Sequence, residues 1–310
     1  MSTPITPEPL LLQFETNTKC NAACTFCQHR NMKRSGTAKW SQIISILYNY
    51  AHKANEICPF GMQEPLLEPR FSAILANCKQ LNRNAQTVVY SNMSIYDEAT
   101  WREIIMRGTL DTLRISFYGI DKKTYNTLQP GLDYEQVQSN IKRLVKLRRR
   151  MRWNKPELNI HLVLMPETGQ GAIKFIRKWK PIMDHVALMH YDSWHGELPY
   201  DDEFEATTWG PRHERVPCHR LWSSLNIHYD GTVVPCCIDY NDTMPMGNIH
   251  EDANIWAQGE KMQQMRSLHL QKRWNEIPLC QNCGLWRYES PKEWREYWAQ
   301  QKPVLSVANR

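Results

Sequence analysis

The feature that most constrains this fold is a regular alternation of short apolar runs with helical patterns over the first two thirds of the 310 residues. Six apolar runs are expected to be strands: residues 11–16, 56–58, 86–90, 113–117, 158–165 and 186–189. Segments between them carry apolar residues at helical spacing. Repeated strand–helix units predict a parallel sheet with right-handed crossovers. We therefore expect an α/β fold, a partial (βα)6 TIM-like barrel, with the active site in the loops that follow the strands.

The pattern changes after about residue 195, where residues 195–205 are expected to form a linker. Beyond it, Asp230-Gly231 lies between two apolar runs, which predicts a hairpin. A helix is expected around residues 260–270, followed by a final cysteine pair. We expect three parts: a barrel over 1–200, a small cysteine-rich domain over 201–290 and a tail over 291–310.

Charge and composition exclude several classes of protein. The net charge is +6, and the one basic stretch, Lys146–Arg152, is expected to be the solvated end of a helix. Because no nucleic-acid-binding module accompanies it, nucleic acid is not an expected partner. No apolar run reaches the ~18 residues of a membrane span, and no signal-peptide pattern begins the chain. We expect a cytoplasmic protein without a membrane partner.

The ten cysteines are too few for a disulfide scaffold, and most of them are clustered. Clustered cysteines in a reducing compartment indicate metal ligands. Eight stand at short or ordered spacings: Cys20, Cys24, Cys27, Cys218, Cys236, Cys237, Cys280 and Cys283. Cys58 and Cys78 stand alone and are expected to be small buried residues.

The first cluster, Cys20, Cys24 and Cys27, follows the first expected strand. Three thiolates at this spacing can bind one face of a 4Fe–4S cube, which needs four ligands. One iron would then stay open to a substrate or cofactor. Structural zinc is the alternative, with His29 as a fourth ligand.

The Cys-x3-Cys-x2-Cys loop, with Phe26 before its third cysteine, resembles that of the radical S-adenosylmethionine (SAM) superfamily. Three further segments resemble motifs of this family, in order and each after an expected strand: Glu64-Pro65-Leu66-Leu67, Ser91-Asn92, and Arg114-Ile115-Ser116-Phe117-Tyr118-Gly119. The likeness covers about residues 10–190. Met93 stands where the family has a glycine, and Gln129 stands near the position of a family arginine.

The resemblance implies a 4Fe–4S cluster on Cys20, Cys24 and Cys27, with SAM chelated to its open iron. Reductive cleavage of SAM then gives a 5′-deoxyadenosyl radical that abstracts a substrate hydrogen, with electrons from a reduced flavodoxin- or ferredoxin-type donor. The SAM contacts implied are Phe26, Glu64, Ser91, Asn92, Ser116 and Gln129.

The rear cysteines form the pattern Cys218-x12-Gly231-x4-Cys236, followed by Cys280-x2-Cys283. Four thiolates from two pairs suit either zinc or a closed cubane. The spacing resembles the SPASM or twitch extension of radical SAM enzymes. That resemblance implies an auxiliary 4Fe–4S cluster on Cys218, Cys236, Cys280 and Cys283.

Cys237 adjoins one of these ligands, and two interpretations stay open. It is either a packing residue or alternate ligand, or a hydrogen-atom donor like the cysteine of the family's epimerases. Tyr191, Asp192, Trp194 and His195 follow the sixth strand and are expected to contact substrate.

Three functions are considered. The leading one is hydrogen abstraction from a small carbohydrate or aminocyclitol, ending in epimerisation or dehydrogenation. The alternatives are maturation of a ribosomally made peptide and, in another class, a zinc-stabilised binding protein.

Overall fold

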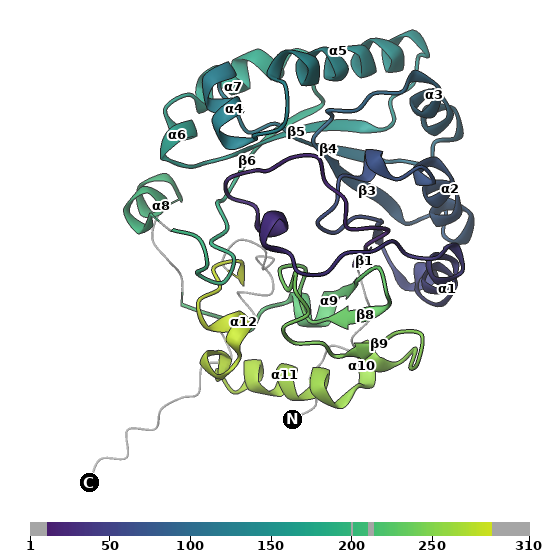
Figure 1. The fold of residues 1–310 in the computed structure, drawn as a ribbon, viewed down its shortest axis with the longest axis vertical. Coiled ribbons are helices and arrows are strands. Elements are labelled where there is room, and N and C mark those ends of the chain that lie inside the picture. The colour runs from purple at the N-terminus through teal and green to yellow at the C-terminus, as the bar shows by residue number, and fades with distance from the viewer. Residues whose placement is uncertain (1–10, 200, 210–213, 287–310) are drawn as a thin grey trace.

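The computed structural model describes residues 11–199, 201–209 and 214–286 (Figure 1). Nine strands form one sheet in the order β6-β5-β4-β3-β2-β1-β7-β8-β9. They are β1 (Leu11–Phe14), β2 (Glu56–Cys58), β3 (Gln86–Ser91), β4 (Thr112–Ser116), β5 (Glu157–Val163), β6 (His185–Met189), β7 (Ser224–Ile227), β8 (Thr232–Val234) and β9 (Gly247–Asn248). All neighbours from β1 to β6 pair in parallel, which confirms the predicted partial barrel.

The barrel helices lie along the outer side of the curved sheet (Figure 1). They are α1 (Trp40–Tyr50), α2 (Phe71–Leu81), α3 (Glu98–Arg107), α4 (Lys122–Leu128), α5 (Tyr134–Arg150), α6 (Pro166–Gly169) and α7 (Ala172–Trp179). The side chains of Asp97, Asp121 and Asp133 accept backbone N–H bonds at the starts of α3, α4 and α5. Gly108 ends α3 at φ 58°, the left-handed conformation that glycine favours.

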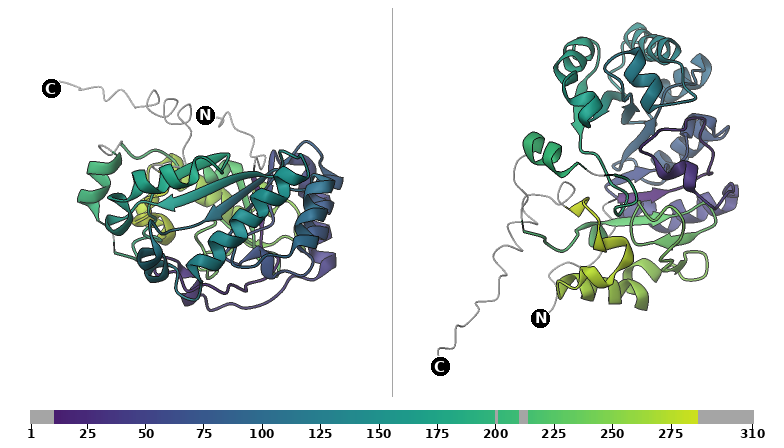
Figure 2. Two further views of the ribbon diagram at one scale, coloured as in Figure 1. Left: turned by 90° about the horizontal axis from the view of Figure 1, so that it is seen from above. Right: turned by 60° about the vertical axis from the view of Figure 1, so that its left-hand side comes forward.

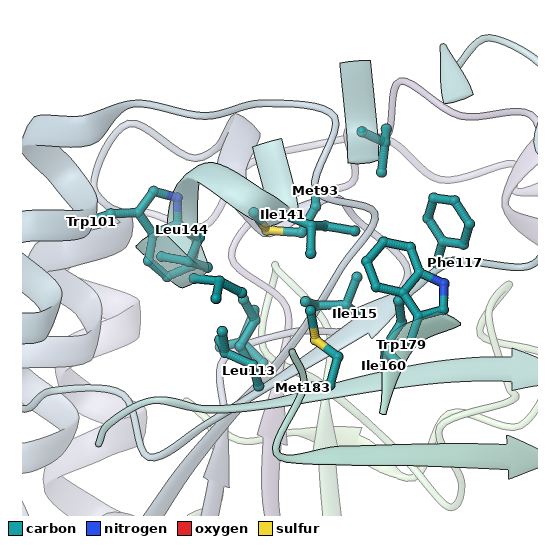
Figure 3. Close-up of a cluster of buried hydrophobic side chains, with 14 of the residues drawn as sticks. Met93, Trp101, Leu113, Ile115, Phe117, Ile141, Leu144, Ile160, Trp179 and Met183 are labelled. Carbon is teal, nitrogen blue, oxygen red and sulfur yellow. The ribbon is translucent and has the colours of Figure 1, made fainter. Parts of the chain in front are cut away.

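One apolar core joins these helices to the barrel strands (Figure 3). Trp101 of α3, Ile141 and Leu144 of α5, and Trp179 of α7 pack with strand residues such as Ile115. All five side chains are almost completely excluded from water. Burying each large apolar side chain contributes roughly 1.5–3 kcal/mol, so this core fixes the strand ends that carry the site.

The C-terminal segment continues the same sheet. β7 pairs in parallel with β1, so that Leu11 lies opposite Ser224. β7 and β8 form the predicted hairpin, and its turn contains Gly231 at φ 92°. The expected helix at 260–270 is α11 (Glu260–Leu270).

A second core joins the C-terminal segment to the front of the barrel. Ile43 and Leu47 of α1 belong to the same buried cluster as Leu225, Trp256 and Met262. Figure 2 shows this segment beside the first strands of the barrel. The two parts therefore share both a sheet and a core.

The expected linker, residues 195–205, ends inside a helix, α8 (Asp202–Trp209). The sequence prediction missed it because its acidic first turn looked like a charged loop. Asp202, Glu203 and Glu205 instead complement the positive end of the helix dipole. The expected tail, 291–310, lies outside the described residues.

The remaining short elements are η1 (Gln28–Asn31), η2 (Ala51–Lys53), η3 (Pro65–Leu67), α9 (Arg220–Ser223), α10 (Ile255–Gln258), η4 (Trp274–Glu276) and α12 (Pro278–Gln281). Across the described residues, no helix combines the length and apolarity that a bilayer crossing requires.

Candidate functional site

The front cysteines lie in the long loop between β1 and η1, drawn in purple across the middle of Figure 1. Backbone hydrogen bonds attach this loop to the last residue of α4 and to the segment that follows it. The Ala23 N–H donates to the Pro130 carbonyl at 2.8 Å, and the Thr25 N–H donates to the Leu128 carbonyl at 3.0 Å. The thiols are therefore held by backbone contacts on both sides of Cys24.

A cavity of about 240 Å³ lies against this loop. All three thiols and all six predicted SAM contacts line it: Cys20, Cys24, Cys27, Phe26, Glu64, Ser91, Asn92, Ser116 and Gln129. These residues come from five segments: the loop after β1, the segment after β2, the ends of β3 and β4, and the residue that follows α4. The sheet thus brings together the segments that the sequence motifs singled out, and their individual roles stay predictions.

Glu64 is the buried acid of this cavity, with only 3% of the residue exposed. Its carboxylate accepts bonds from the Ser91 hydroxyl at 2.7 Å, the Asn92 N–H at 2.7 Å and the Leu66 N–H at 3.1 Å. Burial raises the pKa of Glu64 to about 7, and these three hydrogen bonds oppose the shift. The carboxylate is therefore fixed in place and poised to take a cationic or N–H-bearing partner.

Asn92 and Met93 form a tight turn at the end of β3. The Asn92 side-chain oxygen accepts from the Ser94 N–H at 2.9 Å. Its side-chain nitrogen donates to the side-chain oxygen of Asn21 at 3.0 Å. Met93 has φ 56°, which explains why the family motif carries glycine here. Asn140 donates to the Met93 carbonyl at 3.0 Å and helps to hold this conformation.

Gln129 is completely buried and hydrogen-bonds the backbone at the end of β4. Its amide oxygen accepts the Tyr118 N–H at 2.8 Å, and its amide nitrogen donates to the Ser116 carbonyl at 3.1 Å. The same side chain also opposes the rise in the pKa of Cys24 that burial causes. The amide therefore holds the end of β4 next to the loop of the front cysteines, and it also lines the cavity.

The three front cysteines line one cavity, as a three-cysteine 4Fe–4S site requires. Within the described ranges, no three His, Cys, Asp or Glu side chains converge closely enough to hold one metal ion. In a 4Fe–4S cluster each thiolate binds a different iron, so its ligands are more widely spread. His29, the expected fourth zinc ligand, has its Nε2 at 2.8 Å from the Thr18 carbonyl, to which it must donate. The residue expected as the fourth zinc ligand is therefore engaged by the backbone instead.

Burial also shapes the chemistry of the three thiols. It raises the pKa of Cys20 to about 11 and that of Cys24 to about 12, and the neighbouring thiols add to both shifts. Thiols of this kind bind metal only after they lose their protons. Assembly of a cluster in this loop must therefore release protons.

The four cysteines predicted to bind the auxiliary cluster lie in the C-terminal segment. Burial raises the pKa of Cys280 and Cys283, and the nearby Cys218 thiol adds to both. The pKa of Cys236 is raised mainly by a hydrogen bond with the Cys237 side chain, and Cys218 contributes there too. The Cys218 thiol therefore acts electrostatically on the three other predicted ligands, and a four-thiolate cluster on these cysteines stays a prediction.

A larger cavity, about 700 Å³, lies between the barrel and the C-terminal segment. It shares six residues with the smaller cavity: Phe60, Met62, Tyr90, His190, Asp192 and Trp194. Cys237 lines it, and Arg220 donates to the Cys237 sulfur at 3.3 Å. The sequence analysis missed Arg220, whose one available signal was its position two residues after Cys218.

Three of the four predicted substrate residues lie at this cavity. Tyr191, Asp192 and Trp194 line it, whereas His195 lines neither this cavity nor the smaller one. The Trp194 indole N–H donates to the Phe26 carbonyl at 2.9 Å. The Trp194 ring also lies edge-on to the Tyr240 ring, with 5.8 Å between the two ring centroids. Trp194 therefore also connects the front loop to the C-terminal segment.

Comparison with known proteins agrees with this arrangement. The family profile of the radical SAM superfamily matches residues 14–177, and that of the SPASM iron–sulfur cluster-binding domain matches residues 218–284. No match is found among curated proteins.

Solved structures with the same fold include BtrN in complex with AdoMet and 2-DOIA. It has 17% identity and a TM-score of 0.59, over 92% of this chain and 94% of that one. Streptococcus suis SuiB bound to the precursor peptide SuiA has 16% identity and a TM-score of 0.66, over 85% and 68%. Native anSMEcpe with bound AdoMet and Cp18Cys peptide has 17% identity and a TM-score of 0.61, over 89% and 88%.

The superfamily profile spans more than half of the chain, and the SPASM profile covers the rear cysteines. The cofactors are accordingly 4Fe–4S clusters and SAM, and the activity begins with reductive cleavage of SAM. The chain belongs to the radical SAM superfamily and carries a SPASM-type auxiliary-cluster region.

Proposed function

We propose that this enzyme abstracts a hydrogen atom from a small carbohydrate- or aminocyclitol-type substrate and returns one from Cys237, which inverts the carbon. The observation that carries this proposal is the position of Cys237 in the wall of the 700 Å³ cavity. The C-terminal segment contributes Cys237 to this wall. Cys237 is not among the residues that the cavity shares with the smaller one of about 240 Å³. Removal of hydrogen from one side and its return from another is what inversion requires.

The lining of the large cavity supports a small polar substrate. Glu56 and Asp192 supply carboxylates, Arg114 a guanidinium and Asn159 an amide. Such groups complement hydroxyl and amino substituents through hydrogen bonds of both directions. The volume also falls within the roughly 300–1,000 Å³ typical of small-molecule sites.

When bound, the reduced front cluster and SAM supply the radical that removes the substrate hydrogen. The S–H bond of Cys237 then breaks as its hydrogen atom forms the new C–H bond. The sulfur radical takes up one electron, ultimately from a reduced flavodoxin- or ferredoxin-type donor, and one proton from solvent. Arg220 contacts the Cys237 sulfur and keeps it at the cavity wall.

Dehydrogenation begins with the same abstraction but does not need a thiol donor. It therefore competes with epimerisation as the outcome, and Cys237 decides between them.

Peptide maturation is the second candidate because a further cavity adjoins the 700 Å³ cavity. A cavity of about 550 Å³ shares His190 and Tyr191 with the 700 Å³ cavity. Two adjoining cavities would accept an extended chain. Two structural relatives, SuiB and anSMEcpe, are solved with peptides bound.

The test uses anaerobically reconstituted enzyme in deuterated water, with sugars, aminocyclitols and their phosphates as candidate substrates. We expect a product with an inverted carbon that carries one solvent deuterium. Cys237→Ala should abolish this label and give oxidised or stalled product. Cys58→Ala removes another thiol that lines the same cavity and should keep the label. A labelled, inverted product from Cys237→Ala would refute the donor role.

A further inference from the structure

His269 lies completely buried on α11, between two of the predicted rear-cluster ligands. The Cys218 backbone N–H lies 3.2 Å from its Nδ1, and the Cys280 sulfur lies 3.3 Å from its Nε2. Both ring nitrogens therefore form hydrogen bonds: Nδ1 with the backbone of Cys218 and Nε2 with the sulfur of Cys280.

These two contacts fix the tautomer of the ring. A backbone amide can only donate, so Nδ1 accepts and carries no proton. A neutral imidazole has one N–H, which must then be at Nε2. The Nε2–H consequently donates to the Cys280 sulfur, which becomes a thiolate when it binds iron.

The surroundings hold the ring in this orientation. The Arg266 guanidinium on the same helix donates to the Leu221 carbonyl at 2.9 Å and ties α11 to α9. Trp274 lies with its ring centroid 6.3 Å from that of His269. The Arg215 guanidinium covers the Trp274 ring at 4.9 Å and donates to the Cys280 carbonyl at 2.7 Å.

An N–H bond to a cluster thiolate has a defined electronic consequence. Reduction adds negative charge to the cluster and its sulfurs, so a donor stabilises the reduced form more than the oxidised form. Hydrogen bonds to sulfur are among the factors that set cluster potentials.

We propose that His269 is a positioning residue of the auxiliary cluster: it orients Cys218 and Cys280 and raises the reduction potential of the cluster through its Nε2–H···S bond. This inference rests on the auxiliary cluster and is independent of the substrate and of Cys237.

Two substitutions separate the two functions of the ring. His269→Asn places an amide near Nδ1, so it keeps an acceptor for the Cys218 N–H but removes the donor to Cys280. His269→Gln places an amide near Nε2, so it keeps a donor to Cys280 and loses the acceptor. His228→Asn is a matched control, because His228 is another buried histidine of the C-terminal segment whose Nδ1 contacts Asp242.

The measurement is a redox titration of the reconstituted holoenzymes followed by electron paramagnetic resonance. Added SAM distinguishes the clusters, since it changes the signal of the front one. In His269→Asn we expect the ratio of reduced to oxidised auxiliary cluster at a fixed potential to fall about tenfold. This corresponds to a reduction potential that is lower by about 59 mV for a one-electron couple. His269→Gln and His228→Asn should stay near the parent, and the front cluster should not change.

Three results would overturn the proposal. One is an unchanged auxiliary potential in His269→Asn. Another is an equal fall in His269→Asn and His269→Gln, which would indicate loss of packing rather than of the donor. The third is direct nitrogen coupling to the auxiliary cluster in the parent, which would make His269 an iron ligand. If His269→Asn does not load the cluster, a fall in His269→Gln alone also contradicts the proposal.

Discussion

The two cysteine sites of this molecule lie in one sheet-based fold but differ in what surrounds their thiols. The front site has three cysteines in a loop, and all three line a cavity together with Glu64. The rear site has four predicted ligands, and His269 and Arg215 hydrogen-bond one of them, Cys280. A site with a missing ligand and adjoining space can bind an exchangeable cofactor, whereas a fully ligated site can only store or relay electrons.

The largest expected effect separates the two sites by their function. Cys24→Ala should reduce the iron content from about eight to about four per chain and abolish SAM cleavage with a chemical reductant. Cys280→Ala should lose the same amount of iron but keep SAM cleavage, because the front cluster remains. Iron analysis and assay of 5′-deoxyadenosine measure both.

Cys78→Ala is the matched control for these variants, because Cys78 is completely buried in the barrel. It should keep about eight irons. Loss of SAM cleavage in Cys280→Ala, with its front cluster intact, would break the distinction between the sites.

The next effect concerns the connection between the two regions. Arg34, between η1 and α1, forms a bidentate pair with Glu15 at the start of the front loop and donates to the Tyr240 carbonyl at 2.7 Å. Its side chain is 9% exposed and that of Glu15 is 3% exposed. Arg34→Met should lower the free energy of unfolding by about 3–5 kcal/mol, because it leaves a buried carboxylate unpaired. Urea denaturation of the cofactor-free chain measures this.

An exposed ion pair provides the control for Arg34. Arg102 pairs with Glu98 at 3.1 Å, and both side chains are more than 40% exposed. Arg102→Met should change the unfolding free energy by no more than about 1 kcal/mol. Equal effects of the two substitutions would mean that the front loop is not anchored through Arg34.

The smallest effect sharpens the comparison through pH. Burial raises the pKa of Glu64 to about 7 in the folded chain, above its ordinary 4.5. A raised carboxyl pKa means that the folded state binds more protons than the unfolded state between these values. Glu64 therefore contributes stability at low pH that is lost as the pH rises through about 7, amounting to roughly 3 kcal/mol.

The measurement is the difference in unfolding free energy between the parent and Glu64→Gln at pH 5 and pH 8, both without cofactor. The difference isolates Glu64 from histidines that titrate in the same range. We expect the parent to lose stability relative to Glu64→Gln as the pH rises. A constant difference would show that the hydrogen bonds from Ser91 and Asn92 keep the carboxylate ionised throughout.

Local patterns predicted much of this molecule. Apolar periodicity located the six barrel strands and most of their helices, and the order of the strands placed Glu64, Ser91 and Ser116 at one edge of the sheet. That success has a physical reason, because the carboxyl ends of parallel strands meet.

Long-range side-chain contacts were not predictable in the same way. The pairing of β7 with β1 has no local signal, since both strands are four residues long. Arg220 and His269 are single residues without a repeated spacing, and only the packing of α9 and α11 brings them to sulfur atoms. Met93 looked like a departure from a motif, and its φ of 56° shows that the turn itself is kept.

The pairing of β1 with β7 also has a consequence for synthesis of the chain. Leu11 leaves the ribosome long before Ser224. The edge of β1 that pairs with β7 is therefore unpaired while the barrel is synthesised. Unpaired strand edges on nascent chains favour association with other chains. Slow or interrupted translation before β7 should therefore expose this edge, and chaperones that shield strands early would matter most there.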